Sequence, residues 1–233
     1  MTASNLHGAD AAADPAGEPV DEARESMDRM YRLQRHFYDL TRKYYLFGRD
    51  GLIERLAPAP GETVLEVGCG TARNLVKMAR RYPQARFCGL DASDEMLKTA
   101  TVKVARAGLA GRIPLAQAFA QTFTPETFGR AEKFDRIVFS YTLSIIPGPL
   151  DALDNALDQL KPGGALHVVD FGDAHGLPDW FREILAWWLE KFHVAHRPEV
   201  GDWFAYRAAE GRGRLETRTI GGRYAEFFTL VKA

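Results

Sequence analysis

Short apolar runs and helical patterns alternate along the central part of the chain. The short runs are rich in β-branched and other apolar residues, and they predict strands over residues 63–67, 86–90, 113–118, 134–140 and 165–170. Between them, apolar residues recur at helical spacing and predict helices over residues 72–82, 93–107 and 149–160. Ser93 suits the start of the second helix, because its hydroxyl can accept a hydrogen bond from an orphan backbone N–H group. This alternation is typical of an open α/β sheet.

The pattern before the first strand is different. Residues 1–21 contain almost no large apolar side chains and predict a disordered tail. Residues 22–57 have a helical pattern that Gly48 is expected to break, and they predict a helical lid in front of a single core domain at 58–233. The lid is basic and aromatic, with Arg29, Arg32, Arg35, Arg42, Lys43, Arg49, Tyr31, Tyr38, Tyr44, Tyr45, Phe37 and Phe47. Such a segment is usually a solvated basic face, and it equally suits the binding of an acidic or lipid head group.

The C-terminal part of the pattern predicts a helix at 178–192 and a closing hairpin. In the helix, one apolar stripe is most simply explained as core, and it consists of Phe181, Leu185, Trp188 and Phe192. Trp187 lies on the side of Glu183 and Glu190, which also fits an interfacial anchor or a substrate wall. Two β-rich runs at 215–220 and 224–231 flank a two-glycine turn, so the last strand is expected to be antiparallel.

Composition narrows the class of protein. A length of 233 residues suits one domain with a single large core. The net charge of −1 argues against a dedicated nucleic-acid binder, which is normally clearly basic. The two cysteines, Cys69 and Cys88, lack metal-ligand spacing and do not suggest a disulfide framework. Because no signal-peptide pattern and no apolar run of ~18 residues occurs, we expect a cytoplasmic location, with at most peripheral contact to a membrane.

The segment from Val64 to Asp91 carries the clearest chemical information. It predicts a buried strand, a glycine turn, a helix and a second strand that ends in an acid. Gly68 and Gly70 allow the backbone to turn tightly and to approach a ligand closely. Asp91 follows at about the ~20-residue spacing at which an acid reaches ribose hydroxyls. The unit therefore predicts a nucleoside-bearing cofactor at the carboxyl end of the sheet.

Two classes of cofactor compete for this turn. A loop that binds a nicotinamide dinucleotide usually has a third glycine, but Arg73 occupies that position in this chain. Glu66, just before the turn, would repel a pyrophosphate, whereas it suits the amino acid end of a cationic cofactor. The loop resembles motif I of class I S-adenosylmethionine (SAM) methyltransferases, with Ala72 in place of the last glycine. That resemblance implies that backbone N–H groups of residues 68–71 meet the methionine end of SAM.

The ends of the third and fourth strands supply further candidates. At the position where the family often has an acid that binds the adenine amine, this chain has Phe119. Phe119 suits either core packing or a wall of the adenine pocket. Gln121 is another candidate for adenine binding. Ser140, Tyr141 and Ser144 follow the fourth strand, whose carboxyl end faces the ligand crevice in such sheets. A tyrosine there is more often a packing residue than a substrate contact, and both interpretations of Tyr141 stay open.

The chain also resembles a narrower family. The run from Met30 to Asp50 is similar to the N-terminal region of bacterial betaine-lipid methyltransferases, as are residues 140–147 and 169–178. The resemblance implies a Rossmann-like, class I methyltransferase fold with a seven-stranded, mostly parallel sheet and a helical lid. It implies successive N-methylation of diacylglyceryl-homoserine at a membrane surface, with SAM as methyl donor and S-adenosylhomocysteine as product. The cofactor contacts implied are Glu66, Gly68, Cys69, Gly70, Thr71, Asp91, Ala92, Met96, Phe119, Ala120 and Ser140.

The same resemblance suggests how the substrate is handled. The candidate catalytic residues are Tyr31, His36, Tyr38, Arg42 and Tyr141. The donor is already activated, so the protein mainly has to align nitrogen, carbon and sulfur for an SN2 transfer, and no metal is needed. His36, Tyr38 or a water is the candidate base, and Arg42 or Arg49 is the candidate partner of the homoserine carboxylate. Another amine acceptor, such as phosphatidylethanolamine or a soluble metabolite, and a nicotinamide-dependent oxidoreductase remain the alternatives.

Overall fold

The computed structural model describes residues 46–191, 194 and 196–233. The expected tail at 1–21 and most of the helical lid at 22–57 therefore lie outside the described residues. Of the lid, the helix α2 (Arg49–Leu56) is described, and it begins directly after Gly48, whose φ of 86° is left-handed. A helix boundary at this glycine was predicted from the sequence.

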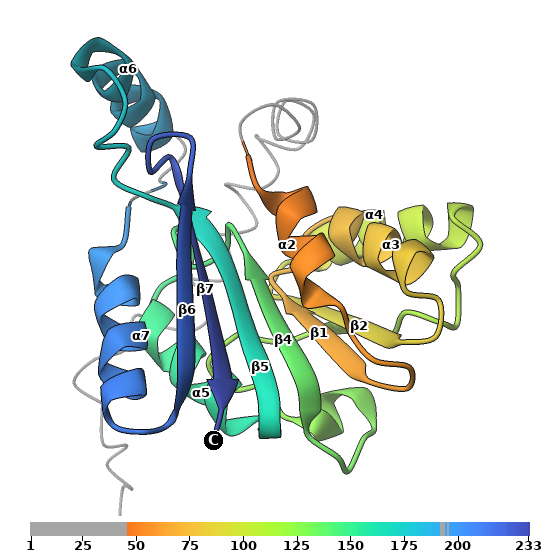
Figure 1. The fold of residues 1–233 in the computed structure, drawn as a ribbon. Coiled ribbons are helices and arrows are strands. Elements are labelled where there is room, and N and C mark those ends of the chain that lie inside the picture. Colours follow the sequence, from red (N-terminus) through yellow and green to blue (C-terminus); the bar gives the residue numbers. More distant parts are fainter. Residues whose placement is uncertain (1–45, 192–193, 195) are drawn as a thin grey trace, which may run out of the picture.

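A twisted sheet of seven strands forms the centre of the molecule (Figure 1). The strands are β1 (Thr63–Val67), β2 (Arg86–Asp91), β3 (Leu115–Gln117), β4 (Phe134–Ser140), β5 (Leu160–Phe171), β6 (Gly213–Ile220) and β7 (Ala225–Lys232). Their order is β3-β2-β1-β4-β5-β7-β6, and β7 is antiparallel to both of its neighbours. The predicted fold, a mostly parallel sheet with an antiparallel hairpin, is confirmed.

Two strands differ from their predicted bounds. β3 covers only three residues, because it pairs with β2 alone at Gly89 to Asp91. β5 begins at Leu160, so it includes the segment 161–164 that was predicted as a turn before the strand. Its register with β4 shifts between Phe134 and Arg136, which accommodates extra residues, and Gly163 takes a φ of 75° there. The glycines thus form an irregularity within the strand.

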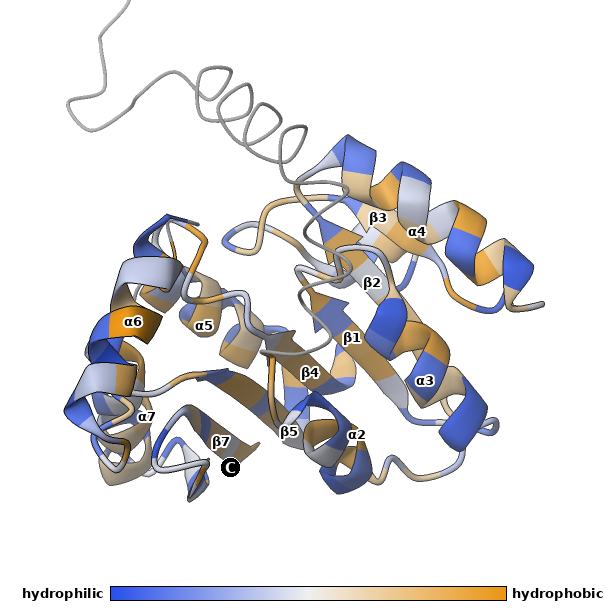
Figure 2. Cartoon of the chain, turned by 90° about the horizontal axis from the view of Figure 1, so that it is seen from above, coloured by the Kyte–Doolittle hydropathy of each residue, from blue (hydrophilic) through white to orange (hydrophobic). Residues whose placement is uncertain are grey.

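Helices cover both faces of the sheet, as the view from above shows (Figure 2). They are α3 (Arg73–Arg81), α4 (Asp94–Arg106), α5 (Pro149–Asp158), α6 (Asp179–Glu190) and α7 (Pro198–Ala209), with a 3₁₀ turn, η1, at Pro125–Phe128. Ser93 caps α4 as predicted, since its hydroxyl accepts a hydrogen bond from the N–H of Met96 at 3.3 Å. The sequence analysis missed α7, although Val200, Trp203 and Phe204 form its buried side at helical spacing.

The core consists of two layers, one on each face of the sheet. One layer joins α2, α3 and α4 to residues such as Val64 and Val138. The other joins α5 and α7 to neighbours such as Leu65 and Ile137. Because successive strand residues point to opposite faces, β1 and β4 supply both layers. Strands buried on both faces explain the continuous apolar runs in the sequence.

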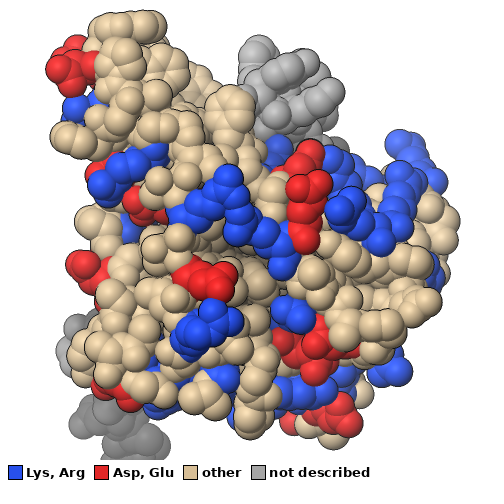
Figure 3. Space-filling view, in the orientation of Figure 1, with Lys and Arg blue, Asp and Glu red and all other residues tan. Residues whose placement is uncertain are grey.

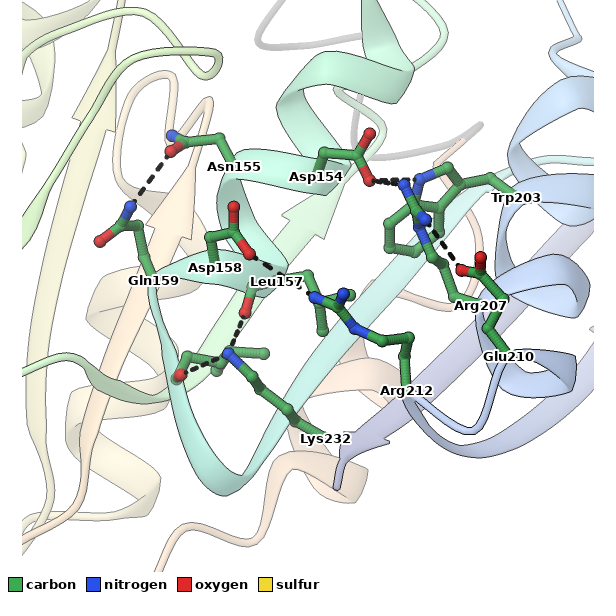
Figure 4. A network of polar contacts seen from close by, with 11 residues as sticks. Asp154, Asn155, Leu157, Asp158, Gln159, Trp203, Arg207, Glu210, Arg212 and Lys232 are labelled. Atoms are coloured by element: carbon green, nitrogen blue, oxygen red, sulfur yellow. Dashed lines mark hydrogen bonds and ion pairs between the residues drawn. The ribbon is translucent and has the colours of Figure 1, made fainter.

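A polar network ties α5, α7 and β7 together (Figure 4). The carboxylate of Asp154 accepts hydrogen bonds from Trp203 Nε1 at 2.8 Å and from Arg207 at 2.5 Å. The Lys232 ammonium donates to the carbonyls of Leu157 at 2.7 Å and Leu160 at 3.0 Å. These bonds fasten the C-terminal hairpin and α7 to the core.

The helix α6 does not pack as predicted. None of its residues is buried, and Phe181, which was expected in the core, is 37% exposed. Leu185 does pack against the core from a partly buried position, whereas Phe192 lies outside the described residues. The prediction of a core stripe is wrong for this helix, because α6 extends beyond the sheet's edge (Figure 1). Over the ranges 46–191, 194 and 196–233, the structure contains no helix with the length and apolar character needed to span a bilayer.

Candidate functional site

A pocket opens at the carboxyl ends of β1, β2 and β4. Its position is the topological switch point of the sheet. β2 and β3 lie on one side of β1, and β4 and the later strands lie on the other. The structure brings together in its lining all of the predicted cofactor contacts and one predicted catalytic residue: Glu66, Gly68, Cys69, Gly70, Thr71, Asp91, Ala92, Met96, Phe119, Ala120, Ser140 and Tyr141.

The turn after β1 is shaped by Gly68. Its φ is 67°, and an added Cβ would lie 2.4 Å from Cγ2 of Thr142. Any side chain at this position would therefore both strain the backbone and displace the loop after β4. The hydroxyl of Thr142 donates to the carbonyl of Val67 at 3.3 Å, so the two loops that form the pocket floor are joined. Thr142 was missed by the sequence analysis, since nothing in the sequence pairs it with a glycine so far away in the chain.

Ala72 completes the turn in an unfavourable conformation. It precedes α3 with a φ of 60° and is fully buried. The left-handed region suits glycine, which is the residue that motif I usually has here, and an alanine in it is strained by about 1–2 kcal/mol. The turn therefore keeps the backbone path of the motif despite the substitution.

Asp91 lies at the end of β2 and braces the turn. Its carboxylate accepts a hydrogen bond from the N–H of Gly70 at 2.8 Å and another from the N–H of Ser93 at 2.9 Å. The side chain is buried but lines the pocket. A carboxylate at the end of the second strand of such a sheet is placed to accept hydrogen bonds from hydroxyl groups of a ligand.

Two backbone N–H groups of the turn, those of Cys69 and Gly70, have hydrogen-bond partners within the protein. The N–H of Cys69 donates to the carbonyl of Leu90, and that of Gly70 donates to Asp91, both within 2.9 Å. These two groups are therefore engaged inside the protein. The expectation that N–H groups of residues 68–71 meet the methionine end of SAM stays a prediction. The hydrogen bonds of Cys69 and Gly70 hold the end of β1 against β2 and orient the carboxylate of Asp91.

Glu66 is the most unusual ionisable group in the pocket. Oε1 accepts a hydrogen bond from Nδ2 of Asn74 at 2.8 Å, while Oε2 is buried and has no hydrogen-bond partner among the described residues. Burial raises the pKa of Glu66 to about 7, against the opposing effects of the Asn74 hydrogen bond and the Arg49 charge. A buried oxygen without a partner is costly, and it marks a place where a ligand's donor would be stabilised. Asn74 was missed, because one asparagine in a helix has no distinguishing pattern.

Three cationic side chains line the pocket as well. Arg49 of α2 is 8% exposed, and its Nε donates to the carbonyl of Leu46 at 3.3 Å. Lys103 of α4 donates to the hydroxyl of Thr71 at 2.7 Å, and Arg73 pairs with Asp50 at 3.2 Å. Lys103 was not predicted, since it belongs to a helix that follows the second strand. These cations place positive charge in the same pocket as its two acids, and the charges of Arg49 and Arg73 oppose the rise in the pKa of Glu66.

Tyr141 follows β4 in a left-handed conformation with a φ of 57°. Its N–H donates to the carbonyl of Val169 at 2.8 Å, and its hydroxyl donates to the carbonyl of Phe47. Burial raises the pKa of the Tyr141 hydroxyl well above its usual value. The hydroxyl therefore anchors the chain before α2 to the sheet. An aromatic residue held in this region of φ is unusual and typical of functional loops.

Ser140 and Phe119 lie on other parts of the wall. The hydroxyl oxygen of Ser140 is buried without a hydrogen-bond partner in the described part of the chain. Phe119 is 37% exposed and lines the pocket, so the core-packing interpretation of this residue is wrong. Gln121 closes the wall by donating to the carbonyl of Pro147 at 2.6 Å.

Four predicted catalytic residues cannot be placed in this site. Tyr31, His36, Tyr38 and Arg42 lie outside the described residues, and their roles stay predictions. Arg49, the second candidate partner of a substrate carboxylate, does line the pocket.

Comparison with known proteins finds similarity over the central part of the chain. Residues 64–164 match a family described as a methyltransferase domain. The chain is 37% identical over 117 residues to a trans-aconitate 2-methyltransferase of Streptomyces avermitilis, which covers 49% of this chain and 42% of that protein. It is 28% identical over 155 residues to the ubiquinone/menaquinone biosynthesis C-methyltransferase UbiE of Cereibacter sphaeroides, which covers 66% of this chain and 57% of that protein. The chain thus spans about half the length of the curated relatives it matches.

Solved structures share the fold at low identity. A plantazolicin methyltransferase, BpumL, in complex with S-adenosylhomocysteine has a TM-score of 0.64 at 13% identity, covering 91% of this chain and 98% of that one. A SAM-dependent methyltransferase from Aquifex aeolicus has a TM-score of 0.59 at 18% identity, covering 93% and 100%. The predicted methyltransferase fold is confirmed. The relatives described above are named as trans-aconitate and quinone methyltransferases, so the resemblance to betaine-lipid methyltransferases stays a prediction.

Proposed function

We propose that this chain, in which residues 64–164 match a methyltransferase domain on a class I methyltransferase fold, transfers methyl groups from SAM to an acceptor at the mouth of the pocket. The observation that carries the proposal is the arrangement of Glu66 and Asp91 on either side of a glycine turn. Both acids are buried and line one pocket at the switch point of the sheet. A cationic nucleoside suits two acids, whereas a pyrophosphate does not.

The residues of the pocket fit SAM. Asp91 is held by two backbone N–H groups in a position to accept hydrogen bonds from ribose hydroxyls. The partnerless Oε2 of Glu66 suits the ammonium group of the methionine end. Gly68 leaves space where a Cβ would meet Thr142, and Phe119 supplies an apolar wall for adenine. When bound, SAM supplies a methyl group that its sulfonium already activates.

The protein's part in catalysis is mainly positioning. An amine acceptor first loses a proton to solvent, and its lone pair then attacks the methyl carbon from the side opposite sulfur. The carbon–sulfur bond breaks, and its electron pair stays on sulfur. Alignment of this kind contributes roughly 7–11 kcal/mol in favourable cases. Ser140 and Tyr141 follow β4 at the pocket, so this loop is the structural candidate for orienting the acceptor. The left-handed φ of Tyr141 fixes the loop's direction.

For the acceptor we propose the amine of diacylglyceryl-homoserine, a lipid whose head group carries a carboxylate. Support comes from Arg49, whose guanidinium lines the pocket and suits a carboxylate. The resemblance of residues 30–50 to betaine-lipid methyltransferases is a second support. Acceptor binding at a membrane surface and a cytoplasmic location are part of this proposal, and no nucleic-acid partner is included.

A second acceptor class has its own support. The relative with 37% identity is named a trans-aconitate 2-methyltransferase, which acts on a small molecule rather than a lipid. The cationic residues of the pocket, Arg49 and Arg73, also suit a polycarboxylate. In that case the acceptor atom is a carboxylate oxygen and the product is an ester.

An assay with methyl-labelled SAM separates these acceptors. Purified protein is supplied with detergent-dispersed diacylglyceryl-homoserine, phosphatidylethanolamine or trans-aconitate. We expect label in the homoserine lipid, with three successive methyl groups seen by mass spectrometry. Label in phosphatidylethanolamine or trans-aconitate alone would refute the acceptor and keep the methyltransferase. A calorimetric titration in which NADH binds and SAM does not would refute the methyltransferase itself.

A further inference from the structure

The helix α6 is apolar on two sides, unlike an ordinary surface helix. Leu185 and Leu189 make its apolar contacts with the core. On the opposite side, at helical spacing, Trp180, Ile184 and Trp187 form a continuous stripe. These side chains are 64%, 57% and 57% exposed. A surface helix normally turns such a stripe toward the core.

The exposed stripe itself contains no charged residue. Arg182, Glu183 and Glu190 line a hollow between the helix and the body of the protein, together with Asp173 and His196. In the space-filling view, the lobe that α6 forms at the upper left is mostly uncharged on the visible face (Figure 3). The helix therefore presents an uncharged stripe to the outside, with Glu183 and Glu190 exposed beside it.

The exposed apolar side chains are concentrated near the site. In the described part of the chain, most large exposed apolar residues lie on α6 or beside the pocket, where Phe47 is 56% and Phe119 is 37% exposed. α6 stands beyond the carboxyl edge of the parallel strands, the edge at which the pocket opens (Figure 1). A flat apolar partner that touches α6 would thus lie on the side of the molecule at which the pocket opens.

We propose that α6 docks this protein on the surface of a lipid bilayer. Tryptophan is the side chain that prefers the boundary between acyl chains and water. The ammonium of Lys191 lies 3.9 Å above the Trp187 ring, which keeps a cation at the end of the apolar stripe, where it would reach head groups. The docking itself follows from the helix alone, whereas its use in presenting a lipid acceptor depends on the proposed function.

A second copy of the chain fits this stripe less well. α6 has 12 residues and is therefore about 18 Å long. The four large exposed apolar side chains of α6, which are the three of the stripe and Phe181, offer on the order of 400 Å² of apolar surface. Two copies would then bury about 800 Å² together, below the ~1,200 Å² of a typical stable interface.

Sedimentation with vesicles tests the docking. The full chain is mixed with vesicles of equal parts phosphatidylcholine and phosphatidylethanolamine, without SAM or acceptor. The test variant combines Trp180→Ser, Ile184→Ser and Trp187→Ser. The matched control combines Val102→Ser and Tyr206→Ser, two exposed apolar residues on α4 and α7. We expect the wild type and the control to sediment, and the partition coefficient of the test variant to fall at least tenfold.

Three outcomes would overturn the proposal. They are a wild type that does not bind vesicles, a test variant that binds as well as the control, and a wild-type dimer that the test variant converts to a monomer. Because the three side chains are exposed, we expect the variant to keep the wild-type Tm and SAM affinity, which confirms that it is folded. The acceptor proposal is judged separately with detergent-dispersed lipid, where the variant should remain as active as the control.

Discussion

The pocket edge and the α5–α7 face belong to one sheet but are built in opposite ways. On the α5–α7 face, Asp154 binds two donors and Lys232 binds two carbonyls (Figure 4). At the pocket edge, by contrast, Glu66 Oε2 and the hydroxyl of Ser140 are buried without partners among the described residues. Polar groups at the pocket are thus left for a ligand to satisfy, while those on the other face stabilise the fold.

Backbone strain is distributed in the same uneven way. Ala72 and Tyr141, which both line or support the pocket, have left-handed φ values of 60° and 57°. The helix α5 contains no such residue, and its Ala152 and Ala156 are fully buried in regular structure. Strain that persists in a folded protein indicates that the surrounding structure imposes it, and it is concentrated where ligands bind. Substitutions in the two regions should therefore affect different properties.

The largest effect is expected from Gly68→Ala. The new Cβ would meet Thr142 at 2.4 Å in a left-handed backbone, so the pocket floor must move. We expect SAM affinity to fall below detection by calorimetry. Gly61→Ala is the matched control, because Gly61 has a φ of 84° with nothing within 4 Å of the added Cβ. It should lower stability by about 1 kcal/mol and leave SAM affinity unchanged. Equal SAM affinity in the two variants would contradict the assigned turn.

Asp91→Ala should give the next largest effect. Hydrogen bonds to a charged group contribute roughly 1.5–3 kcal/mol, so SAM affinity should decrease about 10- to 100-fold. Asp154→Ala, on the other face, removes an acid that also binds two donors. That variant should have a lower Tm and wild-type SAM affinity. If Asp154→Ala weakened SAM binding as much as Asp91→Ala, the two regions would not be separate.

The charge of Glu66 predicts a pH effect. Its pKa is about 7 in the folded protein, against an ordinary value of 4.5, so the folded state binds the proton more tightly. The free energy of unfolding should therefore fall as pH rises from about 4.5 to about 7, by up to about 3 kcal/mol. Glu66→Gln removes this fall, which urea denaturation at pH 5 and pH 8 would measure. SAM affinity should rise through pH 7 in the wild type only, because the ionised carboxylate attracts the ammonium group. A pH dependence of stability that is identical in both proteins would contradict the assignment.

The smallest effect is expected from Ala72→Gly. Relief of the left-handed strain should offset the loss of a buried methyl group, so Tm should change little. Ala152→Gly, a buried alanine in right-handed helix, has no such compensation and should lose at least about 1 kcal/mol. Thermal unfolding of both variants compares the two regions directly. A large loss of stability in Ala72→Gly would show that the turn is not strained.

Most of the fold and both acids of the pocket could be predicted from the sequence. Continuous apolar runs identified the buried strands, and the turn with Gly68 and Asp91 identified the cofactor edge. Local pattern did not reveal contacts between distant segments, such as Thr142 against Gly68 or Asn74 on Glu66. It also could not decide which apolar residues of α6 are exposed, because apolar spacing defines a helix face without saying what covers it.

The measurement that tests the central claim most directly is a crystal structure with S-adenosylhomocysteine. Our account predicts the ribose hydroxyls on the carboxylate of Asp91 and the amino group beside Oε2 of Glu66, with adenine against Phe119. A ligand bound elsewhere on the molecule, or a ribose that makes no contact with Asp91, would contradict it.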